Sequence, residues 1–94
     1  MSGTDIGKVL EERGNRYGSF VGHAEVSTGL SHVIAEELRK RNKGLEADQA
    51  EALMMICHKI ARIVNGDPDY ADNWVDIAGY AKLVADRLEQ QGNG

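Results

Sequence analysis

Apolar residues recur along the chain at intervals of three and four positions, the spacing that places side chains on one face of an α-helix. The pattern predicts four helices. They cover about residues 4–13, 21–41 and 47–65, and a last segment that begins at Asp69 or Asp72 and ends near Glu89. Thr4 or Asp5 is the expected first residue of the first helix.

Glycine, asparagine and proline residues mark the expected breaks between these helices. The segment 14–20, with two glycines and an asparagine, should end the first helix and form a loop. The second helix should end at residues 42–44, and the third at residues 65–68, where Gly66 fits the C′ position.

The third helix differs from the others because apolar residues cover most of its circumference. These residues are Leu53, Met54, Ile56, Cys57, Ile60, Ala61, Ile63 and Val64. A helix of this kind is central in the fold or shared between subunits. Asp48 and Glu51, three residues apart, resemble a capping box at its start.

The 94 residues form one domain, residues 1–94, of a size that supports only a small core. Aromatic residues make up 5% of the chain and Pro68 is the only proline, which favours packed helices over a β-sandwich. We therefore expect an all-α fold, a bundle of three to four helices that self-associates to bury more apolar surface. Residues 1–3 and 90–94 are expected to fray.

The net charge of −4 disfavours nucleic-acid binding, which requires a basic face. A small anion held by a few local cations is compatible with this charge. Cys57 is the only cysteine, so no intrachain disulfide forms. No apolar run reaches the ~18 residues of a membrane span. The sequence thus predicts a soluble cytoplasmic protein with neither a nucleic-acid nor a membrane partner.

Three basic side chains cluster on the third helix, at His58, Lys59 and Arg62. They lie within about one turn of each other and beside apolar surface. An arginine fork and a lysine point charge suit phosphate, so the cluster is a candidate phosphate or nucleotide site. The alternative is a solvated face, or ion pairs with the acidic residues of the next helix.

Asp72 and Asp76 are four residues apart and share one face of the fourth helix. Paired carboxylates of this kind can hold Mg²⁺, with Glu37 or Glu51 as a further ligand. They can equally stabilise the helix N-terminus and pair with the cations of the third helix.

Two further positions suit a nucleotide. In the loop before the second helix, Arg16 would contact phosphate and Tyr17 a base; alternatively, Tyr17 and Phe20 close the end of the bundle. Gly79 interrupts the fourth helix at a cost of about 1 kcal/mol relative to alanine, which suggests close approach of another backbone, a neighbouring subunit or a ligand. Tyr80 beside it would stack on a base or pack in the core.

Several segments taken together resemble a family of small uncharacterised helical proteins of bacteriophages and prophages. They are ERGNRYGSF (residues 12–20), HKIARI (58–63), NGDP (65–68) and DIAGYAKL (76–83). The resemblance covers most of the chain and is least distinctive over residues 21–47. It implies a small helical protein acting in the host cytoplasm and brings no assigned activity with it.

More distantly, the last two helices resemble the all-α nucleotide pyrophosphatases of the MazG and dUTPase type. Those enzymes place Glu-x-x-Glu on one helix and Glu-x-x-Asp on the next to hold Mg²⁺ against a nucleotide. This chain lacks Glu-x-x-Glu, spaces Asp72 and Asp76 four apart, and has Lys59 and Arg62 where acidic ligands are expected. The resemblance therefore implies phosphate binding rather than hydrolysis.

These observations favour non-catalytic binding of a nucleotide or other phosphorylated small molecule by a homo-oligomer, without a cofactor. The expected ligand-binding residues are Arg16, Tyr17, His58, Lys59, Arg62 and Tyr80. One version is a sponge that sequesters a nucleotide signal of the host's antiviral defence. One alternative is a Mg²⁺-dependent nucleoside triphosphate pyrophosphatase with Asp72 and Asp76 as metal ligands. Another is a module that inhibits a host protein through Met54, Met55 and Trp74.

Overall fold

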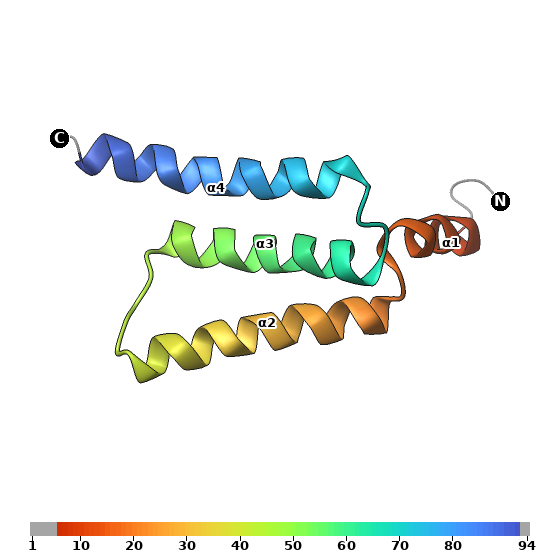
Figure 1. Cartoon of the computed structure of the whole chain (residues 1–94), viewed down its shortest axis with the longest axis horizontal. Helices are drawn as coiled ribbons and strands as arrows, with labels where there is room; N and C mark the ends of the chain where they lie inside the picture. Colours follow the sequence, from red (N-terminus) through yellow and green to blue (C-terminus); the bar gives the residue numbers. More distant parts are fainter. Residues whose placement is uncertain (1–5, 93–94) are drawn as a thin grey trace.

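The structure is a computed structural model that describes residues 6–92, without the side chains of residues 13–15. This part of the chain contains four helices and no strand (Figure 1). The helices are α1 (Ile6–Tyr17), α2 (Phe20–Lys40), α3 (Ala47–Asn65) and α4 (Ala71–Gly92). The predicted all-α fold with up to four helices is confirmed.

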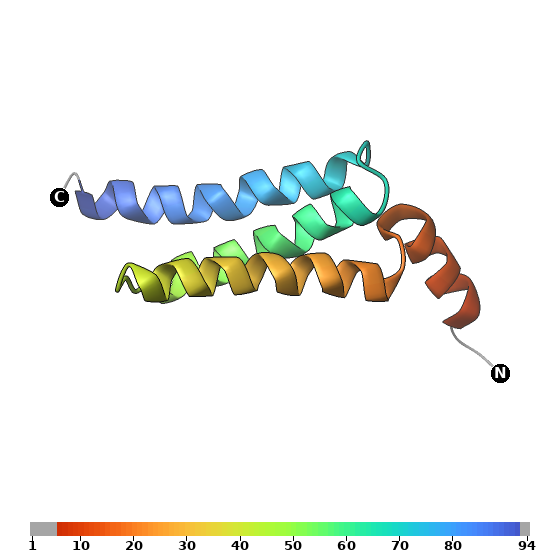
Figure 2. The same cartoon turned by 60° about the horizontal axis from the view of Figure 1, so that its bottom comes forward.

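The three long helices lie side by side in one layer, with α3 in the middle (Figures 1 and 2). Within residues 6–92, α2 and α4 each pack on α3 and do not contact one another. The short α1 lies across one end of the layer, beside the start of α2 and the end of α3. The central place predicted for the third helix is confirmed.

The first helix is longer than the sequence pattern predicts. It continues through residues 14 and 15 to Tyr17, so the expected loop 14–20 shrinks to two residues, Gly18 and Ser19. A glycine inside a helix costs only about 1 kcal/mol, which tertiary contacts readily offset. One such contact fixes the end of α1: the backbone N–H of Asp67 donates to the Arg16 carbonyl at 2.7 Å. The expected start at Thr4 or Asp5 lies outside the described residues.

The second helix ends as expected, within one residue of the predicted bound. Asn42 adopts a positive φ of 55°, and the N–H of Lys43 donates back to the Leu38 carbonyl at 2.9 Å. Asparagine tolerates this left-handed conformation, so it terminates the helix as glycine would.

The third helix spans the predicted residues, but the expected capping box of Asp48 and Glu51 is wrong. The N-cap residue is Glu46, which forms a capping box with Gln49: the backbone N–H of Glu46 donates to Gln49 Oε1 at 2.9 Å. Asp48 is therefore already inside the first turn, where its carboxylate is free to reach across to Arg87 of α4.

The ends of the third and fourth helices both differ from expectation. Gly66 has a φ of −128°, so it is not the left-handed C′ residue expected. It is instead required by space, because a Cβ there would overlap the backbone of Arg16 and Tyr17. The fourth helix continues to Gly92, beyond its expected end near Glu89. Of the residues expected to fray, 1–3 and 93–94 lie outside the described part.

The buried core of the described chain is small. Its buried apolar side chains are Ala52, Cys57 and Ala61, all on α3. Cys57 is thus the small buried hydrophobic residue that its apolar surroundings predict. The radius of gyration is 16.4 Å, against about 12 Å expected for a compact chain of this length. No helix in this part has the length and apolar character needed to cross a membrane.

Candidate binding site at the helix junction

The side chain of Asn65 joins the end of α3 to the α1–α2 junction. Its Nδ2 donates to the backbone carbonyl of Tyr17 at 2.9 Å and to that of Ser19 at 2.8 Å. A Cβ at Gly18 or Gly22 would overlap Asn65, so these glycines allow the close approach. Gly18 also has a φ of +79°, which a residue with a side chain rarely adopts. The junction is therefore held by backbone geometry as well as by side chains.

Two tyrosine rings with a guanidinium over each form a cation–aromatic stack beside the junction. The Arg16 guanidinium lies 4.3 Å from the centre of the Tyr70 ring, and that of Arg62 lies 4.5 Å from the centre of the Tyr17 ring. The two tyrosine rings contact each other with centroids 6.3 Å apart. The carboxylate of Asp72, which accepts from the Tyr70 hydroxyl, raises the pKa of Tyr70. The stack places two guanidinium groups at one end of the layer.

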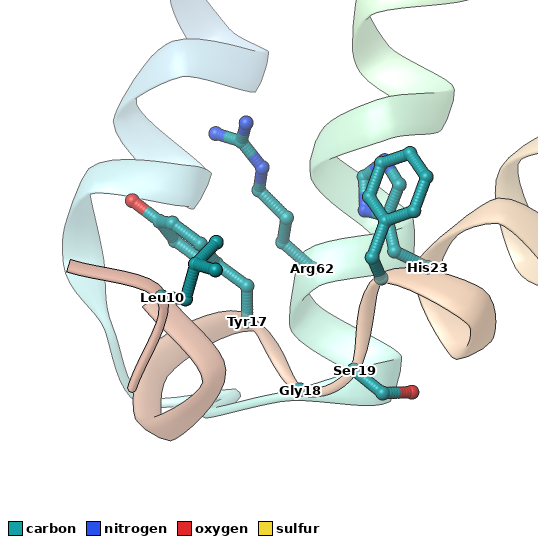
Figure 3. Close-up of a pocket in the computed structure, with 7 residues that line it drawn as sticks. Leu10, Tyr17, Gly18, Ser19, His23 and Arg62 are labelled. Atoms are coloured by element: carbon teal, nitrogen blue, oxygen red, sulfur yellow. The ribbon is translucent and has the colours of Figure 1, made fainter. Parts of the chain in front are cut away.

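A pocket of about 220 Å³ opens next to this stack (Figure 3). It is lined by Leu10, Tyr17, Gly18, Ser19, Phe20, His23 and Arg62. In Figure 3, Tyr17 and Leu10 lie on one side and His23 on the other. Phe20 is 82% exposed, and its ring lies nearly parallel to that of His23, with centroids 6.2 Å apart. The pocket thus combines a guanidinium with accessible aromatic surface.

The Ser19 side chain begins α2 at the edge of this pocket. Its Oγ accepts from the backbone N–H of Gly22 at 3.0 Å, the capping bond expected of serine. The N-terminal end of a helix carries a partial positive charge. The first turn of α2 and Arg62 therefore give this pocket a positive electrostatic character.

His23 connects the pocket to the interface between α2 and α3. Its Nε2 lies 3.1 Å from Nδ1 of His58, and the two ring planes differ by 20°. Ser27, which is 4% exposed, places its hydroxyl 3.4 Å from the same Nδ1. The result is a half-buried polar group of three side chains behind the pocket wall.

The sequence pattern of one known family, described as a domain of unknown function, DUF6378, matches residues 7–88. The chain belongs to the DUF6378 family. No curated protein matches the chain, and no solved structure matches it. The match covers α2 and α3 in full, most of α1 and α4, and every residue that lines the candidate pocket.

In this DUF6378 chain, Lys59 and Asp76 form an ion pair between α3 and α4, with Nζ and Oδ2 2.9 Å apart. Lys59 is only 9% exposed, whereas the Asp76 side chain is 45% exposed. The geometry of Lys59 and Asp76 is therefore that of the structural alternative, an ion pair across the helical hairpin. Asp72, the other carboxylate expected to act with Asp76, is exposed and contacts Tyr70. Glu37 pairs with Lys40 and Arg41 of its own helix region, and Glu51 is exposed.

The structure brings some of the predicted ligand-binding residues together and separates others. Tyr17 and Arg62 line the pocket, and Arg16 lies beside it in the cation–aromatic stack. His58 reaches the pocket only through His23. Lys59 faces α4 instead, and the half-buried Tyr80 does not line the pocket.

Two other predictions about the junction and α4 have clear structural outcomes. Phe20 does not close the bundle end, because its side chain points largely into solvent; Tyr17 is half-buried there.

A Cβ at Gly79 would meet nothing within 4 Å among the described residues of this chain. Any close approach at Gly79 would thus come from a ligand or another subunit.

The sequence interpretation missed His23, Ser27 and Asn65. A signal for the first two exists: His23 and Ser27 are four residues apart, on the same side of α2 as the apolar Val26 and Leu30. Polar residues on an apolar face require a partner. The sequence around Asn65 indicates only a helix stop, and nothing local predicts that its side chain bonds to carbonyls more than 45 positions away.

The described residues of the DUF6378 chain contain no group of three or more His, Cys, Asp or Glu side chains that could hold a metal ion. The polar chemistry of the site is that of guanidinium, imidazole and hydroxyl groups. All three groups can donate hydrogen bonds to an anion, and an imidazole can also accept a proton.

Proposed function

We propose that this protein binds a nucleotide or another phosphorylated small molecule in the junction pocket without transforming it. The observation that carries the proposal is the guanidinium of Arg62, which borders an open pocket of about 220 Å³ together with the exposed ring of Phe20. A planar cation beside accessible aromatic surface suits a ligand with both phosphate and a base.

The phosphate end of the ligand would lie against Arg62 and the first turn of α2. The guanidinium is already oriented by the Tyr17 ring beneath it, so little side-chain freedom is lost on binding. Arg16, over the neighbouring Tyr70 ring, adds a second guanidinium at the edge of the site. Together these groups would offset two phosphate charges.

The base would stack on Phe20. This ring has His23 on one face and is 82% exposed overall, an unusual position for a phenylalanine. Stacking of a base on an aromatic side chain contributes about 1–3 kcal/mol and tolerates different bases. The proposal thus explains why an apolar ring stands at the mouth of a polar pocket.

The experiment is a calorimetric titration of the purified protein with nucleoside mono-, di- and triphosphates and with cyclic dinucleotides. We expect at least one class to bind, with affinity reduced at least tenfold in Arg62→Gln. Arg39→Gln is the matched control, because Arg39 lies on the exposed surface of α2 in an ion pair with Glu36. Absence of binding by every ligand at millimolar concentration would overturn the proposal.

The same samples, incubated with Mg²⁺ or Mn²⁺, test the pyrophosphatase alternative. Release of a nucleoside monophosphate would replace the binding proposal with an enzymatic one, with Asp72 and Asp76 as the first residues to vary. A binder that does no chemistry would act by holding its ligand in the cytoplasm, as the sponge hypothesis requires.

We further propose that the protein is a homo-oligomer, formed through one apolar face of the helical layer. Two apolar grooves flank α3, one of about 390 Å³ against α4 and one of about 190 Å³ against α2. Leu45 and Leu53 line both grooves, so the grooves lie next to each other on one face. Leu53, Met54 and Leu88 are 37%, 50% and 43% exposed there.

The occupant that best fits this face is a second copy of the chain. The small buried core is a property of every copy, so each needs additional burial as soon as it folds. Only another copy is always present in equal amount, and a two-fold interface requires no more than a self-complementary face. A host protein bound to Met54 is the competing occupant.

Sedimentation of the purified protein tests this directly. We expect a mass of at least two chains, and Leu53→Glu should reduce it to one chain or prevent folding. Val75→Glu is the control, because Val75 is 65% exposed on α4 and lines neither groove. A folded wild-type monomer at micromolar concentration would contradict the proposal.

A further inference from the structure

We propose that the ligand of the junction pocket carries a terminal phosphate monoester, and that the His23–His58 pair takes up a proton when this group binds. The inference rests on the proposed function of the pocket. It adds a class of phosphate and a role for two histidines that phosphate binding alone does not require.

The geometry of the pair limits how many protons it holds. The ring centroids are 5.3 Å apart. This separation nearly equals the sum of the 3.1 Å between the facing nitrogens and the radii of the two rings. The rings therefore meet edge to edge in nearly one plane. The N–H of one points at the lone pair of the other, so a single proton lies between His23 Nε2 and His58 Nδ1.

One extra proton strengthens this arrangement, and a second breaks it. When His23 gains a proton at Nδ1, it becomes a cation that still donates from Nε2 to His58, which gives a charge-assisted hydrogen bond. A further proton on Nδ1 of His58 would place two N–H groups against each other. The hydroxyl of Ser27 lies 3.4 Å from the same Nδ1, whose one lone pair already accepts from His23. The pair is thus suited to one added charge.

The charges around His23 make this proton depend on the ligand. Arg62 of α3 lines the same pocket as His23, so its positive charge disfavours a proton on that ring. A phosphate monoester brings −1.5 to −2 charges at about pH 7, with its second pKa about 6. One guanidinium offsets about one of these charges, and a protonated His23 would offset the other. A phosphate diester, with one charge, would not require the proton.

The experiment compares a 5′-nucleoside monophosphate with its phosphate methyl ester on the purified wild-type protein. Calorimetry near pH 7 in buffers of different ionisation enthalpy measures the protons taken up. We expect uptake approaching one proton with the monoester and little with the diester. Near pH 6 the monoester should bind at least tenfold more tightly than the diester, and this ratio of affinities should decrease toward pH 8.

His23→Gln keeps a donor at the Nε2 position but cannot gain the proton. We expect it to bind monoester and diester with similar affinity, without proton uptake, whereas His32→Gln, on the exposed side of α2, behaves as wild type. If wild type binds both ligands equally and without proton uptake, the inference is wrong while the proposed function stands. If neither ligand nor any other nucleotide binds, both are wrong. The wild-type measurement decides the question even where His23→Gln fails to fold.

Discussion

Lys59 on α3 and Asp76 on α4 are joined across 2.9 Å, the lysine 9% exposed and the aspartate about half-exposed. This asymmetry predicts unequal effects of removing either partner. Asp76→Asn leaves a largely buried ammonium without its carboxylate, and we expect a loss of about 1–3 kcal/mol in the free energy of unfolding. Lys59→Met should cost less, because Asp76 keeps its contact with water.

Urea denaturation of both variants checks this prediction. Lys82→Met is the reference, because the pair of Lys82 and Asp86 is exposed within α4. We expect that substitution to change stability by no more than about 0.5 kcal/mol. Equal losses for Asp76→Asn and Lys82→Met would show that burial of Lys59 has no energetic consequence.

The glycines of this chain predict opposite effects of the same substitution. Gly66→Ala should destabilise the protein strongly, because the new Cβ would overlap the backbone at the end of α1. Gly29→Ala, in the middle of α2 with nothing within 4 Å of its Cβ position, should stabilise by up to about 1 kcal/mol. Thermal melting followed by circular dichroism distinguishes the two, and a higher melting temperature for Gly66→Ala would contradict the described docking of α1.

The ion pair of Asp48 with Arg87 predicts a pH dependence of stability. The guanidinium, through hydrogen bonds of 2.8 and 2.5 Å, lowers the pKa of Asp48 below its ordinary value. A carboxyl with a lowered folded-state pKa stabilises the fold above its unfolded pKa, and this contribution is lost as pH falls through the folded value. Arg87→Gln should therefore be less stable than wild type near neutral pH, with the difference vanishing in acid.

Denaturation of wild type and Arg87→Gln across the acidic range measures that difference. Arg39→Gln is an informative companion, because Arg39 likewise lowers the pKa of Glu36 and should show the same sign. A stability difference for Arg87→Gln that grows as pH falls would contradict the assigned direction.

Sequence reasoning placed the helices well because helical periodicity is a local signal. The bounds of α3 depend on its own residues, from the polar turn before Ala47 to Asn65 and Gly66, and they were predicted correctly. The end of α1 was not, because the contact of Asp67 with Arg16 that fixes it joins residues far apart in sequence. Local composition there indicates only a break.

The candidate site was predictable only in part for the same reason. Arg16, Tyr17 and Arg62 have side chains suited to a nucleotide, and they were selected on that basis. That Arg62 lies over Tyr17 depends on how α1 docks against α3. The contact between His23 and His58 depends on the register of α2 against α3, which periodicity alone leaves undetermined.

The cation–aromatic stack makes a last prediction, on the titration of Tyr70. Its pKa is raised chiefly by the carboxylate of Asp72 and lowered to a smaller extent by Arg16. Asp72→Asn should therefore shift the Tyr70 titration to lower pH, and Arg16→Gln should shift it to higher pH. Ultraviolet absorbance of the tyrosinate reports both shifts, and Tyr70→Phe identifies which transition belongs to this residue. Shifts of the same sign in the two variants would mean that Asp72 and Arg16 do not have opposite electrostatic effects on the Tyr70 hydroxyl. That result would contradict the arrangement of the stack that orients the guanidinium groups of the pocket.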